Sequence, residues 1–291
     1  MKMLPLLLSL MVSAGTAATT DAAAPIPPPP DMFARENLVA WCIVPFDAKK
    51  RGPEERAAML ESLGLKRFAY DYRTEHIPTW DQELNALKRH NIELSAWWFP
   101  ETLNDEAKQA LELFLRHGVK PQLWVMGSGL PTKNATEQEA RVEAEAARIK
   151  TIAAAAAPLG LYVALYNHGN WFGEPENQIA IIERLRRDGI SNVGIVYNLH
   201  HGHAHLDRLP ALMAQMKPYL LALNLNGMSR KPSNGILVIG QGEEDAYVLK
   251  VIKDSGWRGL VGILNHTNED AATRLEANLD GLEKLLRNSS R

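Results

Sequence analysis

Residues 161–198 read LYVALYNHGNWFGEPENQIAIIERLRRDGISNVGIVYN, and this stretch decides the fold. It begins and ends with short apolar runs, at 161–167 and 193–198, which are typical of strands buried on both faces. The segment between them, 175–188, has the apolar spacing of an amphipathic helix. A strand, a helix and a second strand in this order predict two parallel strands joined by a helical crossover.

The same unit recurs along the chain after residue 30. Apolar runs lie at 38–45, 67–72, 92–99, 121–126, 161–167, 193–198, 220–226 and 259–264. Helical stretches follow them at 53–63, 80–90, 105–117, 137–157, 175–188, 206–216, 243–254 and 270–286. Eight such units, in a region close to the ~250 residues typical of the fold, predict an α/β protein with a single (β/α)8 TIM barrel over residues 38–287. A doubly wound open sheet is the alternative, but no glycine-rich turn follows the first run.

Composition excludes several classes of protein. The 291 residues carry a net charge of −2, and Lys and Arg form no block, so neither a nucleic-acid partner nor a charged membrane-binding surface is indicated. The single cysteine, Cys42, allows no internal disulfide and lies in the apolar run LVAWCIVP, where we expect a core residue. The sequence carries no signal for an oligomeric state.

The N-terminus has the pattern of a secretory signal. Lys2 precedes a short apolar segment, and small residues that suit cleavage follow it. We expect a signal peptide over residues 1–24, a proline-rich spacer over 25–37 and an exported protein that leaves the membrane after cleavage. An apolar N-terminal anchor that stays attached is the alternative.

Polar residues concentrate where the apolar runs end, which in a TIM barrel is the end that carries the active site. Candidate catalytic residues are His168, His201, Asp71 and Glu101. Candidate substrate-binding residues are Trp98, Trp124, Tyr166, Asn167, Trp171, Asn198, Asn224, Asn226, Asn265 and His266. Tryptophan rings stack on sugar rings, and Asn and His hydrogen-bond hydroxyl groups, so the expected partner is a small carbohydrate. An Asn at such a position can also simply cap the next helix.

The segment NLHHGHAH, residues 198–205, holds four histidines. His200 and His201 directly follow the strand, so at least one of them can point into the barrel mouth. We expect His203 and His205 to be solvated or capping residues. Side chains alternate along a strand, so Trp97 and Trp98 cannot both face the barrel interior.

These motifs resemble the sugar phosphate isomerase/epimerase family, the xylose isomerase-like TIM barrels. LYNHGNW resembles the family's fifth-strand motif, NVGIVYNLHHGH its sixth, VIGQGEED its glycine-rich turn and GLVGILNH its last strand. The resemblance implies a divalent metal held by Glu, Asp, His and Glu. The corresponding positions here are Tyr166, Asn198, Leu223 or Asn224, and Asn265, so the usual cage for a hard cation is missing. A possible divalent metal site made of His168, His201 and His266 is left open.

The resemblance implies an enzyme that removes a proton beside the carbonyl of a sugar, keto-sugar or glycoside, for epimerisation, isomerisation or β-elimination, and the signal-like N-terminus leads us to expect an exported one. We expect His168 or His201 to be the base, with a pKa near neutrality. The alternative is a non-catalytic carbohydrate-binding barrel that has lost the family's metal cage. A glycosidase that pairs two carboxylates among Asp71, Glu101 and Glu174 is a further alternative that stays open. Endonuclease activity is not expected, because this chain lacks the basic surface that binding DNA would need.

Overall fold

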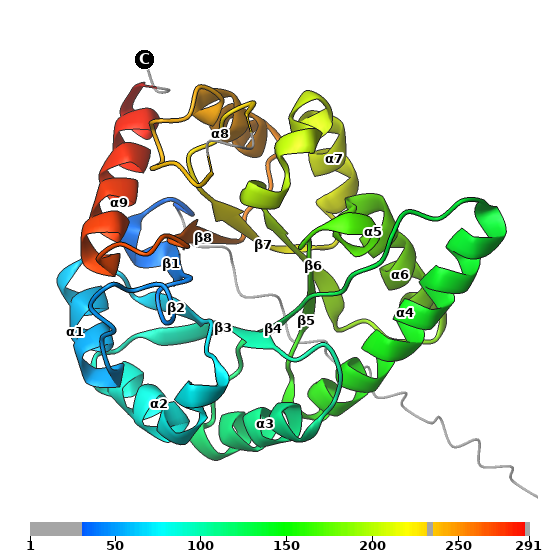
Figure 1. Ribbon diagram of the computed structural model, residues 1–291, viewed down its shortest axis with the longest axis horizontal. Helices are drawn as coiled ribbons and strands as arrows, with labels where there is room; N and C mark the ends of the chain where they lie inside the picture. Colours follow the sequence, from blue (N-terminus) through cyan, green and yellow to red (C-terminus); the bar gives the residue numbers. More distant parts are fainter. Residues whose placement is uncertain (1–30, 232–234, 289–291) are drawn as a thin grey trace, which may run out of the picture.

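The computed structural model describes residues 31–231 and 235–288, and these form a closed barrel of parallel strands (Figure 1). Each strand pairs with the next in the chain, and β1 pairs with β8 to close the ring. The strands are β1 Leu38–Trp41, β2 Arg67–Tyr70, β3 Glu93–Phe99, β4 Gln122–Val125, β5 Val163–Tyr166, β6 Val193–Asn198, β7 Leu220–Leu225 and β8 Leu260–Leu264. The predicted (β/α)8 barrel is confirmed, whereas the predicted signal peptide and residues 25–30 lie outside the described residues.

Helices cover the outside of the barrel (Figure 1). They are α1 Pro53–Ser62, α2 Trp80–Arg89, α3 Asp105–His117, α4 Ala135–Ala156, α5 Asn170–Gly173, α6 Pro175–Arg187, α7 Leu209–Met216, α8 Asp245–Asp254 and α9 Ala271–Asn288. Short 3-10 helices are η1 Arg35–Asn37, η2 Thr74–Thr79, η3 Ala157–Leu159, η4 Leu199–His201 and η5 His203–Arg208. Within residues 31–231 and 235–288, no helix has the length and apolarity needed to cross a membrane.

The boundaries of most elements differ by only a few residues from those expected. The first strand ends at Trp41, four residues before the end of the expected run 38–45. After β6, α7 begins only at Leu209 because the preceding residues form η4 and η5. Residues 31–37, expected as part of the proline-rich spacer, include residues that pack against the barrel. Met32 and Phe33 are only 3% and 8% exposed and belong to the apolar core, so the packed part of the chain begins before Leu38.

Two sets of side chains alternate along the strands. Outward-facing residues, such as Trp97, pack between the sheet and the helices. Inward-facing residues form a separate cluster in which large Trp41, Trp124 and Tyr166 side chains fit among alanines. These alanines are Ala69, Ala96, Ala164 and Ala222. Trp98 packs against the inner cluster, so the two adjacent tryptophans face opposite sides of the sheet, as alternation requires.

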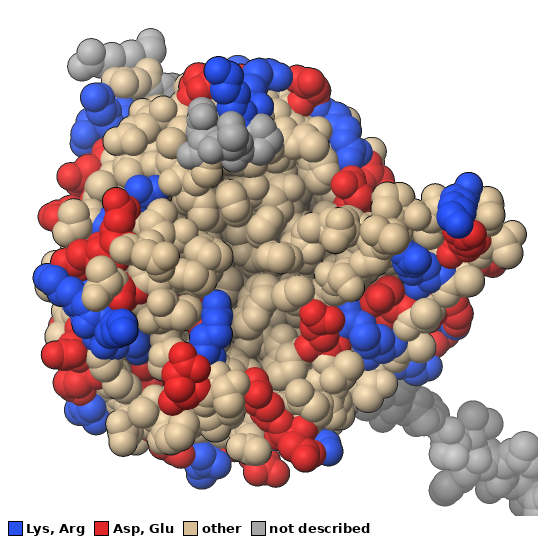
Figure 2. Space-filling view, viewed as in Figure 1, with Lys and Arg blue, Asp and Glu red and all other residues tan. Residues whose placement is uncertain are grey.

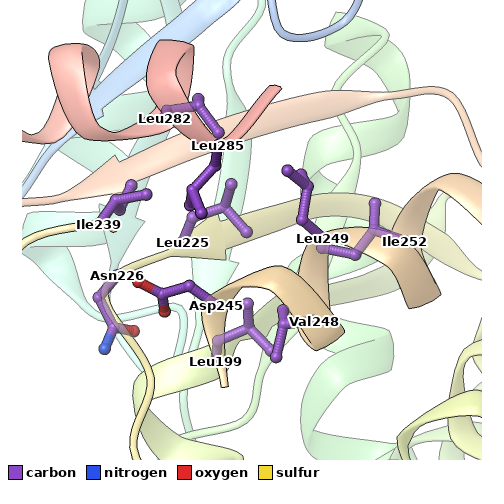
Figure 3. A pocket seen from close by; sticks show the side chains of 10 residues that line it. All are labelled: Leu199, Leu225, Asn226, Ile239, Asp245, Val248, Leu249, Ile252, Leu282 and Leu285. Carbon is purple, nitrogen blue, oxygen red and sulfur yellow. The ribbon is translucent and has the colours of Figure 1, made fainter. Parts of the chain in front are cut away.

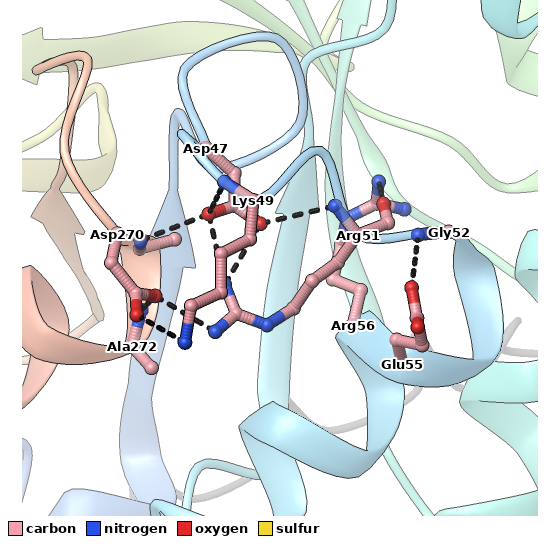
Figure 4. A network of polar contacts seen from close by, with 9 residues as sticks. Asp47, Lys49, Arg51, Gly52, Glu55, Arg56, Asp270 and Ala272 are labelled. Atoms are coloured by element: carbon pink, nitrogen blue, oxygen red, sulfur yellow. Dashed lines mark hydrogen bonds and ion pairs between the residues drawn. The ribbon is translucent and has the colours of Figure 1, made fainter.

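A polar network ties the first loop to the last helix (Figure 4). The carboxylate of Asp47 accepts hydrogen bonds from the backbone N–H groups of Lys49, Arg51 and Ala271, and pairs with the Arg51 guanidinium. Arg51 also pairs with Asp270 at 2.8 Å. The neighbouring Phe46 is thereby held against His266, with ring centroids 3.7 Å apart.

We predict that Asp47→Asn lowers the free energy of unfolding at pH 7 by about 1–3 kcal/mol, because buried N–H donors lose their charged acceptor. Burial alone would raise the pKa of Asp47, but the N–H of Ala271 and the Arg51 guanidinium hold it below its ordinary value. Since the folded pKa is the lower one, this stabilisation is present at neutral pH and is lost as the pH falls below about 4. Urea denaturation at a series of pH values measures it.

The matched control is Asp280→Asn, since Asp280 lies on the surface with its side chain 70% exposed and only a 3.7 Å ion pair to Arg35. We expect a change below about 0.5 kcal/mol for this variant. Equal losses in both variants, or a difference for Asp47→Asn that does not shrink in acid, would contradict a buried network around Asp47.

Candidate active site

A pocket with a volume of about 230 Å³ lies at the carboxyl ends of the strands. It is lined by Trp41, Cys42, Phe46, Asp71, Arg73, Trp98, Tyr166, His168, Asn198, His200, His201 and His266. The strands contribute its floor, and the loops after β1, β2, β5, β6 and β8 contribute its walls. In Figure 2 the middle of the visible face is mainly neutral, and charged side chains lie mostly towards its edge.

The floor of the pocket is aromatic and neutral. The ring of Trp98 lies 5.9 Å from that of Trp41 and 5.0 Å from that of Tyr166, measured between centroids. The Tyr166 hydroxyl accepts hydrogen bonds from Trp41 Nε1 at 3.1 Å and from the amide of Asn198. Burial raises the pKa of Tyr166 far above its ordinary value, so the phenol stays neutral.

Asn167 fixes Asn198 in place by a reciprocal pair of hydrogen bonds. The Asn198 backbone N–H donates to Asn167 Oδ1 at 2.6 Å, and Asn167 Nδ2 donates to the Asn198 carbonyl at 3.0 Å. Asn167 therefore links the ends of β5 and β6 by hydrogen bonds. Its side chain is outside the pocket lining, so it positions a pocket residue and does not itself face the cavity.

Asp71 is the carboxylate of the pocket wall, and it is almost fully buried. Its Oδ1 accepts the backbone N–H of Val44 at 3.2 Å, whereas Oδ2 is buried without a hydrogen-bond partner among the described residues. Burial raises the pKa of Asp71 to about 7, against the opposing effect of the Arg73 charge. A carboxyl with one free oxygen and a pKa near neutrality can both accept and return a proton.

Three histidines lie side by side on the β5 and β6 side of the pocket. The ring of His201 lies 4.6 Å from that of His168 and 4.9 Å from that of His200. Burial and the neighbouring histidines lower the pKa of His201 to about 3 and that of His200 to about 4. The expected near-neutral pKa of His201 is therefore corrected: burial keeps both rings neutral at physiological pH.

Arg73 brings a positive charge to the rim of the pocket. Its guanidinium carbon lies 5.4 Å from the centre of the Phe46 ring, and Nη1 donates to the carbonyls of Asp71 and Tyr72 at 3.0 and 2.8 Å. Arg73 forms no ion pair with a carboxylate of the described residues. Phe46 and the two carbonyls hold the guanidinium in one place while leaving part of it available.

Of the candidates predicted from sequence, seven line the pocket. They are Asp71, Trp98, Tyr166, His168, Asn198, His201 and His266. Trp124 and Asn224 are buried deeper in the barrel, where Trp124 contacts Trp41 with centroids 4.7 Å apart and Asn224 lies beside Tyr166. Trp171 is buried under α4, with its Nε1 donating to Gln138 at 2.7 Å, and is not part of the pocket.

The remaining candidates also lie outside the pocket. Glu101 is exposed after β3, next to a different surface depression. Asn226 lines a cavity of about 20 Å³ between β7, α8 and α9, which is too small for a sugar (Figure 3). Asp245 also lines that cavity and accepts hydrogen bonds from the N–H groups of Met228 and Gly242, so it orders the loop after β7. Asn265 is fully buried and does not line the pocket.

The expectation that His205 is solvated is wrong. His205 is 3% exposed, and its Nδ1 lies 2.9 Å from the Tyr197 hydroxyl, which faces outward from β6. Its Nε2 lies 3.2 Å from Glu174. His203 is half-buried, with Nδ1 2.8 Å from the carbonyl of Ser229. Both histidines therefore attach the loop after β6 to its neighbours and lie outside the pocket lining.

The candidate list omitted Trp41, Cys42, Phe46, Arg73 and His200, which all line the pocket. Cys42 has a backbone φ of 60°, a left-handed conformation that is uncommon for a residue other than glycine. This turn places consecutive residues Trp41 and Cys42 in the same inner cluster. The apolar run 38–45 hides the point at which the first strand ends, so alternation could not reveal Trp41 and Cys42 as pocket residues.

The residues at the family's metal positions do not fit a hard cation. Tyr166 and Asn198 are neutral and bonded to each other, and Asn265 does not reach the pocket. In the described part of the chain, no three His, Cys, Asp or Glu side chains are arranged to hold a metal ion. His168, His201 and His266 thus do not form a ligand set in this arrangement.

No protein-family model and no curated protein sequence matches the chain, but solved structures do. A 3-keto-D-glucoside 4-epimerase from E. coli has a TM-score of 0.64 and 13% identity, over 87% of this chain and 99% of the other. A D-allulose 3-epimerase from Methylomonas sp., in complex with D-allulose, has a TM-score of 0.61 and 12% identity, over 88% and 96%.

A xylose isomerase domain protein from Alicyclobacillus acidocaldarius has a TM-score of 0.60 and 19% identity, over 88% of this chain and 99% of that protein. Nearly the whole length of each of these proteins is matched. At these identities the similarity establishes the fold alone, a (β/α)8 barrel like those of these proteins.

We predict that the purified protein does not retain Mn²⁺ in stoichiometric amount after incubation with the ion and dialysis, because neutral Tyr166 and Asn198 compensate poorly for dehydrating a hard cation. Elemental analysis of the dialysed protein measures the ratio of metal to chain. One tightly held Mn²⁺ per chain would contradict the prediction, and its loss in an Asn198→Ala variant would assign the ion to this pocket.

Proposed function

We propose that this barrel is a sugar-modifying enzyme, which removes and returns a proton beside the carbonyl group of a sugar or keto-sugar. The observation that carries the proposal is Asp71, a buried carboxyl on the pocket wall. One of its oxygens has no hydrogen-bond partner among the described residues, and its pKa is about 7. Epimerisation, aldose–ketose isomerisation and β-elimination all begin with this proton transfer.

In the proposed step, the Asp71 carboxylate takes the proton as the carbon–hydrogen bond breaks. The electron pair of that bond moves onto the carbonyl oxygen and forms an enolate. Returning the proton to the opposite face of the same carbon gives an epimer. Returning it to the former carbonyl carbon, while the hydroxyl proton of the first carbon moves to the enolate oxygen, gives an isomer. His168, in the loop after β5, is the second candidate proton carrier, because β5 is three strands away from β2 and His168 faces the pocket from another side.

The neutral rings of His200 and His201 suit the enolate oxygen. An imidazole that cannot be protonated at neutral pH still offers one N–H donor, and it gives up no proton when negative charge develops nearby. Burial, which lowers the pKa of both rings, also strengthens this hydrogen bond because little water competes for it. His201 thus has the role of a polarising donor, and Asp71 that of the base.

The remainder of the pocket suits a sugar. Trp41 and Trp98 offer apolar faces to ring C–H groups, and Asn198 offers an amide to hydroxyl groups. The structural neighbours support the same class of substrate, since two of them are named as epimerases of a keto-glucoside and of allulose. A barrel that binds sugar without catalysis is the alternative, favoured by the neutral residues at the family's metal positions.

We predict that the wild-type protein exchanges sugar C–H hydrogen for deuterium in D₂O, and that Asp71→Asn lowers this rate by about 10²–10⁴-fold, the usual loss for a general base. Because the base must be deprotonated, the wild-type rate rises with pH through about 7. Proton NMR of a panel of aldoses, ketoses and keto-glycosides measures both effects.

The control is Asp105→Asn, because Asp105 begins α3 with its side chain 91% exposed and should not affect exchange. Sugar binding without exchange by the wild-type protein would support the non-catalytic alternative. Exchange that survives in Asp71→Asn with its pH profile unchanged would remove Asp71 from the mechanism.

We also propose that the protein is exported, on the evidence of the signal-like residues 1–24. Expression of the full chain in a bacterium should then yield a protein outside the cytoplasm whose N-terminus lies near residue 24. Cell fractionation and mass spectrometry of the N-terminal peptide measure this. An intact N-terminus in the membrane fraction would favour the uncleaved anchor instead.

A further inference from the structure

We infer that the substrate of this pocket carries a carboxylate group, and that Arg73 binds it. The inference rests on the proposed function and specifies its substrate as a sugar acid, such as a uronate. Its basis is the set of charges around the pocket together with the geometry of one guanidinium.

The pocket lining contains one permanent charge. Arg73 is cationic at every physiological pH, and Lys is absent from the lining residues. The other polar lining groups are one amide, a phenol, a thiol, imidazoles, two indoles and a single carboxyl, Asp71, which makes no ion pair with Arg73. Asp71 opposes the Arg73 charge only when it is ionised and makes no direct contact with the guanidinium, whereas an anionic ligand would supply a counter-charge in direct contact.

The guanidinium is positioned before any ligand arrives. Phe46 stacks on it, and Nη1 is held by the carbonyls of Asp71 and Tyr72. No hydrogen bond from Nη2 or Nε to a described residue competes for the planar edge that fits a carboxylate. Phe46 is in turn fixed through the Asp47 network and its contact with His266. A side chain already ordered in this way loses little conformational entropy on binding.

The charge balance favours a carboxylate over a phosphate. A phosphate monoester is close to doubly charged at pH 7, and proteins usually meet it with several cations or backbone N–H groups at a helix N-terminus. Here a single guanidinium lines the pocket, and the only carboxyl in the lining is Asp71, which when ionised would repel a dianion more strongly than a monoanion. One singly charged carboxylate matches one arginine.

Arg73 and Asp71 both point inward from the end of β2, since they are two residues apart. A carboxylate held by Arg73 would lie on the β1–β2–β8 side of the pocket, near Phe46 and His266. The sugar ring could then cover the Trp41 and Trp98 floor, with its oxygen atoms towards His201. The carboxylate therefore anchors one end of the substrate, and Asp71 has access to a carbon between this anchor and the histidines.

Isothermal titration with matched ligands tests the inference. The probes are D-glucuronate and D-galacturonate, their neutral amides, and D-glucose 6-phosphate. We expect at least one uronate to bind about 10- to 100-fold more tightly than its amide, the range for a charge-assisted hydrogen bond, and more tightly than the phosphate. In Arg73→Gln this preference for the acid should disappear, and Arg73→Lys should keep part of it, because the charge remains and the planar fork does not.

The control is Arg187→Gln, since Arg187 is exposed in the last turn of α6 and should leave the preference unchanged. Thermal melting of each variant verifies that it is folded. The inference is overturned if neither uronate binds, if amides bind as tightly as acids, if the phosphate binds best, or if Arg73→Gln keeps the preference for the acid.

These outcomes are separate from those that test the proposed reaction. An Arg73-dependent preference for uronates with no hydrogen exchange on any sugar would support the carboxylate site and contradict the enzyme. Exchange on neutral sugars at equal rates in wild type and Arg73→Gln would support the enzyme and contradict the carboxylate site.

Discussion

Closing eight parallel strands into a ring forces one residue in two along each strand into a confined interior, and the site depends on how this interior is filled. Alanines from β2, β3, β5 and β7 leave room for the rings of Trp41, Trp124 and Tyr166. These rings block the interior below the mouth, so the cavity above them has a solid aromatic floor. A barrel filled by aliphatic side chains of uniform size would lack this layer, and its polar residues would have no apolar surface beside them.

The same filling sets the chemistry of the polar groups. Asp71, His200 and His201 sit next to buried rings and away from water, and this burial disfavours the charged form of each. Burial raises the pKa of the carboxyl towards 7 and lowers the pKa of the imidazoles well below 7. A single physical cause therefore separates the groups into one that exchanges protons near pH 7 and two that stay neutral.

The fold could be predicted because its signal repeats eight times, and a mistake about one unit would not have changed the result. The site was predicted only in part. Residues that follow a strand with unbroken alternation, such as Asp71 and His168, were placed correctly at the mouth. Trp171 and Asn226 were placed at the mouth incorrectly, because the chain turns outward after β5 and β7 and the sequence does not show the direction of these turns. His205 resembled a loop histidine, but a distant partner, Tyr197 on the outer face of β6, buries it.

The link between Asp47 and the N–H of Ala271 joins residues that are 224 positions apart in the chain. Phe46, in the first loop, meets His266, in the last, at the same place. During synthesis the ribosome delivers the first loop long before its partners, so one wall of the pocket stays unfinished until the final strand and helix have emerged. The nascent chain can form α-helices and neighbouring strand pairs as it grows, but the complete cavity belongs only to the finished polypeptide, because contacts of such high sequence separation form after the local ones.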